Sequence, residues 1–262
     1  MIGNLFLKLS GKKKLFNLNF SLLRFFNSMV FGSLWNFKSN GELEAIRIIS
    51  GQIEIRTFFD VGANVGDYFR EVSKILSFTA VDFHLFEPSE STYLKLASST
   101  DSISTARLNK LALGSSIDPG KEFFAKKTHT LSGFYSSAGI DVDAELVSMI
   151  TLDHYCEQLG LETIDFLKID VEGHELEVLK GAKNILSKNG IRIIQFEFGI
   201  NSIEARVYFK DFYDLLGRDY DLYIILSGGM QLIDRYYFEL ESFGKVSNYL
   251  AVLKSLKLDL SK

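Results

Sequence analysis

Beyond residue 40 the chain alternates between short β-rich segments and longer segments with helical spacing, and this alternation constrains the fold most. Strands are predicted at residues 57–61, 83–86, 105–113, 164–169, 191–198, 220–226 and 249–253. Helices are predicted at 42–55, 68–76, from Ser89, and at 151–159, 175–186 and 204–216. Between them, residues 121–150 are expected to be β-rich, marked by Phe123, Phe124, Phe134 and Tyr135. Strands joined by helical crossovers form a parallel sheet with helices on both faces, so the sequence predicts a doubly wound α/β domain.

Composition excludes several other classes of protein. Hydrophobic residues make up 47% of the chain and charged residues 24%, which suits a globular core. The single cysteine, Cys156, excludes an intrachain disulfide and multi-cysteine metal centres. The net charge of −4 argues against a nucleic acid partner. No uninterrupted apolar run is long enough to span a membrane, so we expect a cytoplasmic protein.

Residues 1–40 depart from this average and are expected to form a basic, aromatic helical arm, with the main domain at 41–262. The segment has no Asp or Glu, and its basic residues are Lys8, Lys12, Lys13, Lys14, Arg24 and Lys38. Aromatic residues lie between these charges, among them Phe16, Phe20, Phe25, Phe26 and Trp35. Because helical aromatic residues usually belong to a core, we expect the arm to pack on its own domain or on a second subunit. The alternative is peripheral contact with an anionic membrane surface.

The first predicted strand ends in a glycine-containing turn. Ligands of a doubly wound sheet bind beyond the carboxyl ends of its strands, and here the turn runs from Asp60 through Gly62, Ala63, Asn64 and Gly66 to Tyr68. A dinucleotide fingerprint would need further glycines at positions 64 and 67. Asp-x-Gly-x-x-x-Gly is instead the spacing of the S-adenosylmethionine loop in class I methyltransferases. Any strand-to-helix turn with two glycines is the alternative.

The second and third strands each end in a polar side chain. Glu87, followed by Pro88, closes the second strand 27 positions after Asp60. A carboxylate there suits the ribose hydroxyls of an adenosine ligand, although it could also be a solvated residue at a helix entry. Asn109, near the end of the third strand, is a candidate contact for adenine.

Ionisable residues are densest where the strand at 164–169 ends. Lys168 and Asp170 share one face of this strand, and Asp170, Glu172 and His174 fall at the rim of the sheet. Buried ionisable groups must either pair or meet a ligand, so both a Lys168–Asp170 ion pair and a functional site are open. On the next strand Glu197 interrupts an aromatic run, which indicates the wall of a pocket.

These motifs resemble those of the FkbM-type S-adenosylmethionine-dependent methyltransferases. The matching segments are FFDVGANVGDY (58–68), HLFEP (84–88), ITLDHY (150–155), IDFLKIDVEGHELEVLKGA (164–182) and IIQFEFG (193–199). The resemblance implies a Rossmann-like class I methyltransferase sheet and methylation of a hydroxyl oxygen, commonly on sugars or polyketide-like products. It also implies that residues 60–66 cradle the methionine part of S-adenosylmethionine, that Glu87 binds its ribose, and that Asp170 lies beside the sulfonium.

An alcohol acceptor also needs a general base. His174 and Asp170 are the two leading candidates, with Glu172 and Glu197 as alternatives and Lys168 as a further member of the cluster. The same carboxylates and histidine could instead hold Mg²⁺ or Mn²⁺, which would polarise the acceptor oxygen.

The expected acceptor is a hydroxyl group of a small molecule or glycan, and not a nucleic acid. Two other functions remain open from the sequence. An NAD(P)-dependent oxidoreductase shares the fold and the ribose carboxylate but lacks the glycine fingerprint. A non-catalytic protein that binds an adenosine ligand is the other, and the basic arm is the feature that favours it.

Overall fold

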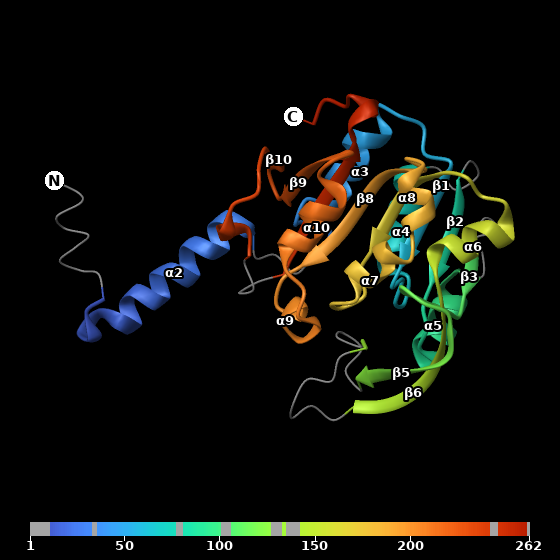
Figure 1. The fold of residues 1–262 in the computed structure, drawn as a ribbon, viewed down its shortest axis with the longest axis horizontal. Helices are drawn as coiled ribbons and strands as arrows, with labels where there is room; N and C mark the ends of the chain where they lie inside the picture. The colour runs from blue at the N-terminus through green and yellow to red at the C-terminus, as the bar shows by residue number, and fades with distance from the viewer. Residues whose placement is uncertain are drawn as a thin grey trace.

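The computed structural model describes residues 11–32, 36–76, 81–100, 106–126, 133–134, 142–241 and 246–260. Lys8, Trp35 and Tyr135, which the sequence analysis named, lie outside these residues. The body is built on an eight-stranded sheet in the order β10-β9-β11-β8-β7-β1-β2-β3 (Figure 1). Its strands are β1 (Thr57–Val61), β2 (Asp82–Phe86), β3 (Ala106–Asn109), β7 (Ile164–Ile169), β8 (Ile191–Phe198), β9 (Tyr220–Leu226), β10 (Gly229–Ile233) and β11 (Ser247–Leu253).

Five neighbouring strands, β8-β7-β1-β2-β3, pair in parallel, as the alternation predicts. The chain runs from β1 outward to β2 and β3, then returns to the other side of β1 for β7 and β8. The strand order therefore reverses between β1 and β7, and this switch point is where such sheets bind ligands.

The expected parallel pairing does not extend to the last two predicted strands, 220–226 and 249–253. β11 pairs antiparallel with both β8 and β9, and β10 pairs antiparallel with β9. The β9–β10 connection is too short for a helical crossover, so it forms a hairpin, and β10 was not predicted from the sequence.

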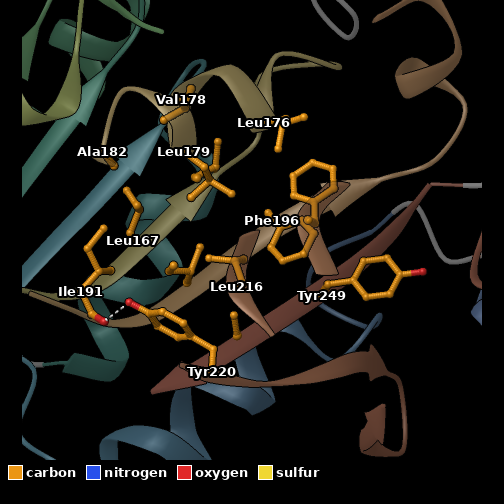
Figure 2. Close-up of a cluster of buried hydrophobic side chains, with 14 of the residues drawn as sticks. Leu167, Leu176, Val178, Leu179, Ala182, Ile191, Phe196, Leu216, Tyr220 and Tyr249 are labelled. Atoms are coloured by element: carbon orange, nitrogen blue, oxygen red, sulfur yellow. Dashed lines mark hydrogen bonds between the residues drawn. The ribbon is translucent and has the colours of Figure 1, made fainter. Parts of the chain in front are cut away.

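Helices cover both faces of the sheet, as predicted. One face packs against α3 (Glu42–Ser50), α4 (Asp67–Leu76) and α5 (Glu90–Thr100). The other face packs against α6 (Leu152–Leu159), α7 (Glu175–Lys180), α8 (Lys183–Ser187) and α10 (Phe209–Leu216). Figure 2 shows part of this second core, where the Tyr220 hydroxyl donates a hydrogen bond to the Ile191 carbonyl at 2.8 Å.

A second, smaller sheet lies beside the main one, in the order β4-β6-β5. Its strands are β4 (Ala112–Leu113), β5 (Asp118–Lys126) and β6 (Val142–Ile150), within the segment predicted to be β-rich. The predicted strand at 105–113 is wrong as one element: β3 ends at Asn109, and β4 pairs with β6 instead of continuing along β2.

Three predicted helices differ from those observed. The first ends at Ser50 instead of residue 55. The second, at 175–186, is broken into α7 and α8. At this break Gly181 lies so close to Gly114 that a Cβ at position 181 would be 2.0 Å from the Gly114 carbonyl oxygen. The third is divided into α9 (Asn201–Ala205) and α10, because Arg206 adopts a left-handed conformation with φ of 56°.

Helix α2 (Phe16–Phe31) projects away from the body (Figure 1). Most of its large apolar side chains are exposed, and Phe31 at its end is buried against the domain. Of the two expected packings of the arm, the described part of α2 does not pack along its own domain, and packing on a second subunit stays a prediction. No helix among the described residues is both long enough and apolar enough to cross a membrane.

Candidate active site

The turn after β1 is locked against the ends of both neighbouring strands. Gly62, Asn64 and Gly66 all adopt positive φ, at 87°, 50° and 84°, and asparagine tolerates this region better than most residues. A Cβ on Gly62 would lie 1.9 Å from the Asp170 carbonyl oxygen, so the backbones of the turn and the β7 end are in direct contact. The Gly62 amide also donates to the Phe86 carbonyl at 3.0 Å. Ala63 anchors the turn in the core.

Glu87 closes β2 directly beside this turn. One carboxylate oxygen accepts a hydrogen bond from the Asn64 amide at 3.1 Å, and the other accepts one from the Ser89 amide at 3.0 Å. The side chain is nearly buried, and burial raises the pKa of Glu87 to about 7. The predicted proximity of the glycine turn and this carboxylate is thus present.

A cleft of about 720 Å³, including its open mouth, lies at this switch point. Among the predicted site residues, those that line it are Gly62, Asn64, Glu87, Pro88, Asp170 and Glu172. Phe123 of β5 and Phe134, which follows the Gly133 bridge to Phe124, close the cleft, and their rings meet edge to face with centroids 5.2 Å apart. The cleft therefore combines an acidic floor at the strand ends with an aromatic wall, a composition typical of small-molecule sites.

Lys168 forms the predicted ion pair with Asp170. Its Nζ lies 2.9 Å from Asp170 Oδ2, 3.7 Å from Asp60 Oδ1 and 4.6 Å from the centroid of the Tyr68 ring. Burial opposes the charge on Lys168, but the carboxylates of Asp170, Asp60 and Glu42 outweigh it and raise the lysine pKa well above its ordinary value. Lys168 therefore stays protonated at neutral pH and positions Asp170.

Asp60 lies beneath the cleft and does not line it. Its side chain is fully buried, and neither carboxylate oxygen accepts a hydrogen bond within the described part of the chain. Burial raises the pKa of Asp60 to about 6, while Lys168 lowers it. Asp60 thus depends on the Lys168 charge for its stabilisation.

A buried hydrogen-bond network below Lys168 was not predicted. The Tyr68 hydroxyl donates to Gln195 Oε1 at 3.0 Å, and Gln195 Nε2 donates to Glu42 Oε2 at 2.6 Å. Asn248 Nδ2 donates to the other Glu42 oxygen at 3.0 Å, and burial raises the pKa of Glu42. The sequence feature that could have indicated this network is Gln195, a polar residue within the mainly apolar strand β8.

The remaining base candidates occupy three different environments. Glu172 lines the cleft in a left-handed conformation with φ of 56°, and its carboxylate accepts a hydrogen bond from the Asn201 side chain. His174 is buried, with its ring centroid 4.4 Å from that of Phe134, and burial lowers the pKa of His174 to about 4. Burial, reinforced by Asp170 and Glu172, raises the pKa of Glu197 well above its ordinary value. Glu172 lines the cleft, whereas His174 and Glu197 are not among the described residues that line it.

The side chain of Asn109 forms hydrogen bonds within the fold. Its Nδ2 donates to the Leu85 carbonyl at 3.1 Å, and its Oδ1 accepts from the Tyr155 hydroxyl at 3.1 Å. These bonds fasten the end of β3 to β2 and to α6, and the cleft wall nearby includes Leu111, Ala112 and Leu113. Contact between Asn109 and adenine stays a prediction.

No group of three or more His, Cys, Asp or Glu side chains in the described ranges is placed to hold a metal ion. Asp170, Glu172 and His174, the candidate metal ligands, are all among the described residues, and they do not form such a group.

The sheet order, with helices on both faces and a cleft at the switch point, is the architecture of a Rossmann-like class I methyltransferase. More specifically, residues 60–222 match the Methyltransferase FkbM domain, and the chain belongs to this family of S-adenosylmethionine-dependent enzymes. The comparisons give no support to the oxidoreductase or the non-catalytic alternative.

Similar proteins include one curated relative and two solved structures. The hexuronic acid methyltransferase AglP of Haloferax volcanii is 26% identical over 171 residues, which cover 64% of this chain and 68% of AglP. The FkbM methyltransferase of Methylobacillus flagellatus is 15% identical with a TM-score of 0.47, and the match covers 77% of this chain and 45% of that one. A putative O-methyltransferase of Klebsiella pneumoniae is 10% identical with a TM-score of 0.47, with 96% and 94% covered.

Proposed function

We propose that this enzyme transfers a methyl group from S-adenosylmethionine to a hydroxyl group of a sugar, a glycan or a similar small molecule. The observation that carries the proposal is the placement of Asp170 in the same cleft as Gly62 and Glu87, opposite the aromatic wall. This arrangement provides a carboxylate able to take a proton where the acceptor would meet the methyl group. Similarity to a hexuronic acid methyltransferase supports a sugar as the acceptor.

The residues at the switch point fit S-adenosylmethionine. The absence of a side chain on Gly62 lets the turn approach the Asp170 carbonyl closely, and Glu87 offers a buried carboxylate beside the turn. Residues 60–66 would hold the methionine part, and Glu87 would accept hydrogen bonds from the ribose hydroxyls. When bound, the cofactor supplies a methyl group on positively charged sulfur. The carboxylate of Glu172 at the cleft complements that charge.

We assign the general base to Asp170. Its side chain is one-third exposed at the cleft, and the bond from Lys168 fixes its orientation. Glu172 is the alternative at the cleft. His174 is not among the described residues that line the cleft, and its ring packs against Phe134. Holding the acceptor oxygen in line with the methyl carbon would supply most of the remaining rate enhancement.

The direct test is a screen of sugars and uronic acids with radiolabelled S-adenosylmethionine, with NAD in parallel reactions. We expect label on a sugar acceptor, in a product that is stable to mild alkali because an ether has formed. An alkali-labile product would be a methyl ester and would contradict a hydroxyl acceptor. Parallel reactions after dialysis against EDTA should retain activity, because the proposed base needs no metal; lost activity restored by Mg²⁺ or Mn²⁺ would favour the metal mechanism.

Replacement of Glu87 by glutamine should weaken binding of S-adenosylmethionine by about 10- to 100-fold, because a hydrogen bond to a charged group is lost. The pKa of Glu87 is about 7, so in the wild type the carboxylate is protonated below that pH and binding weakens. The Kd should therefore fall as pH rises from about 6 to about 8 in the wild type, and change less in the variant.

Isothermal titration calorimetry across this pH range measures both effects. Glu44→Gln is a matched control, because Glu44 is exposed on α3, paired with Arg47 and remote from the cleft. Equal pH dependence in the wild type and the Glu87→Gln variant would remove Glu87 from the cofactor site.

A further inference from the structure

Helix α2 presents an unusually large apolar surface to solvent. Phe16 is 63% exposed and Met29 is 66% exposed, and seven other apolar residues of the helix are also exposed. Contiguous apolar surface of this kind on a soluble domain commonly marks an interaction site. A partner that covers the apolar surface of α2 must match both the shape and the charge of the arm.

The spacing of residues makes α2 amphipathic, with a narrow polar stripe. The stripe follows the helical positions i, i+4, i+7 and i+11, which are Asn17, Ser21, Arg24 and Ser28. The adjoining face carries Leu18, Leu22, Phe25, Phe26 and Met29 at the same kind of spacing. Asn19 and Asn27 fall outside the stripe, so the apolar face is wide but not uniform.

The charge of the arm is opposite in sign to that of the rest of the chain. Residues 1–40 hold six basic residues and no acidic ones. The other 23 of the 29 basic residues and all 33 acidic residues are in 41–262, which therefore has a net charge of −10. An anionic surface would attract the arm and repel the body, so contact through α2 is electrostatically favoured.

The arm leaves the body at the carboxyl edge of the sheet, where the cleft opens. The Ser247 hydroxyl donates to the Phe31 carbonyl at 3.0 Å, and Ser247 pairs with Phe198 at the end of β8. The connections at this same edge hold further exposed apolar residues, among them Ile200, Ile203 and, in the short helix η2 (Phe238–Leu240), Phe238.

We propose that α2 docks this enzyme on the surface of an anionic lipid bilayer. The phenylalanine-rich face would enter the headgroup boundary, with Lys12, Lys13 and Lys14 beside the anionic headgroups. Sixteen residues of helix span about 24 Å, less than the roughly 30 Å of a hydrocarbon core, so the helix lies on the membrane. Docking at this edge would place the cleft near the lipid surface, independently of the reaction performed there.

The test is co-sedimentation of the full chain with vesicles of phosphatidylcholine alone, or with about a third of the lipid replaced by phosphatidylglycerol. We expect binding to the anionic vesicles that is at least tenfold stronger and that weakens at high salt. The double variant Phe25→Gln/Met29→Gln should bind anionic vesicles at least tenfold more weakly. Ser21→Gln/Ser28→Gln introduces the same residues on the polar stripe and should bind like the wild type.

Two outcomes would overturn the proposal. One is equal binding of the wild type to neutral and anionic vesicles, or binding to neither. The other is a dimer in sedimentation equilibrium that Phe25→Gln/Met29→Gln dissociates while vesicle binding stays unchanged, because α2 would then contact a second copy. Because all four substituted side chains are on a projecting helix, far-UV circular dichroism should confirm that each variant keeps its fold.

Discussion

Replacing Asp170 with asparagine should lower kcat/KM by about 10²- to 10⁴-fold, the usual contribution of a general base. Asparagine has nearly the same size and still offers an oxygen to Lys168, whose Nζ lies 2.9 Å from the aspartate. The geometry of the cleft is therefore kept, whereas the group that takes the acceptor proton is lost. Initial rates with a labelled acceptor measure the effect, and circular dichroism shows whether the variant is folded.

The affinity for S-adenosylmethionine separates two roles of Asp170. A base acts on the acceptor, so the Kd for the cofactor should change by less than about threefold while kcat falls. If the Kd instead rises by the same factor as kcat/KM falls, Asp170 binds the sulfonium and the base is another residue. Asp214→Asn is the matched control, because Asp214 is exposed on α10 and pairs with Lys210. Activity of Asp170→Asn near that of the wild type would exclude both roles.

Replacing Lys168 with methionine should reduce the free energy of unfolding by about 3–5 kcal/mol, as is typical when one partner of a buried ion pair is removed. Lys168 is 3% exposed, and its charge faces the fully buried Asp60 and the cleft carboxylate Asp170. Without the ammonium group, Asp60 retains no hydrogen-bond donor among the described residues. Urea unfolding monitored by circular dichroism measures the loss.

The double variant Lys168→Met/Asp60→Asn tests the physical cause of that loss. Removal of both charges should recover a large part of the stability, because the penalty comes from the uncompensated carboxylate. Asp170 can be solvated at the cleft, so it adds less to the penalty. Lys180→Met removes an exposed lysine paired with Glu177 and should change stability by less than about 0.5 kcal/mol. A Lys168→Met variant as stable as Lys180→Met would contradict the electrostatic role of Lys168.

The strands that build the site were the most predictable part of the fold. β1, β2, β7 and β8 are short apolar segments that end in glycine or acidic residues, and such a pattern depends on neighbouring residues alone. The order reversal between β1 and β7 then brings Gly62, Glu87 and Asp170 to one cleft. The roles of these residues stay predictions.

Features that depend on contacts between distant residues were not predictable. Gln195 and Glu42 lie 153 positions apart, and no local pattern links them. The break between α7 and α8 depends on the approach of Gly114 to Gly181, which the helical periodicity of 175–186 does not reveal. The projection of the arm was unpredictable for a different reason: aromatic residues in a helix usually indicate a core, but α2 projects from the body with most of its aromatic side chains exposed.

The two-sheet construction of the cleft has a practical consequence for protein engineering. The strand ends of the main sheet would hold the donor and the base, whereas Phe123 of the opposing aromatic wall belongs to the small sheet. Grafting that sheet from a relative is thus a route to new acceptors that leaves the transfer chemistry in place. The tight backbone contact at Gly62, by contrast, should be left untouched in any such chimera.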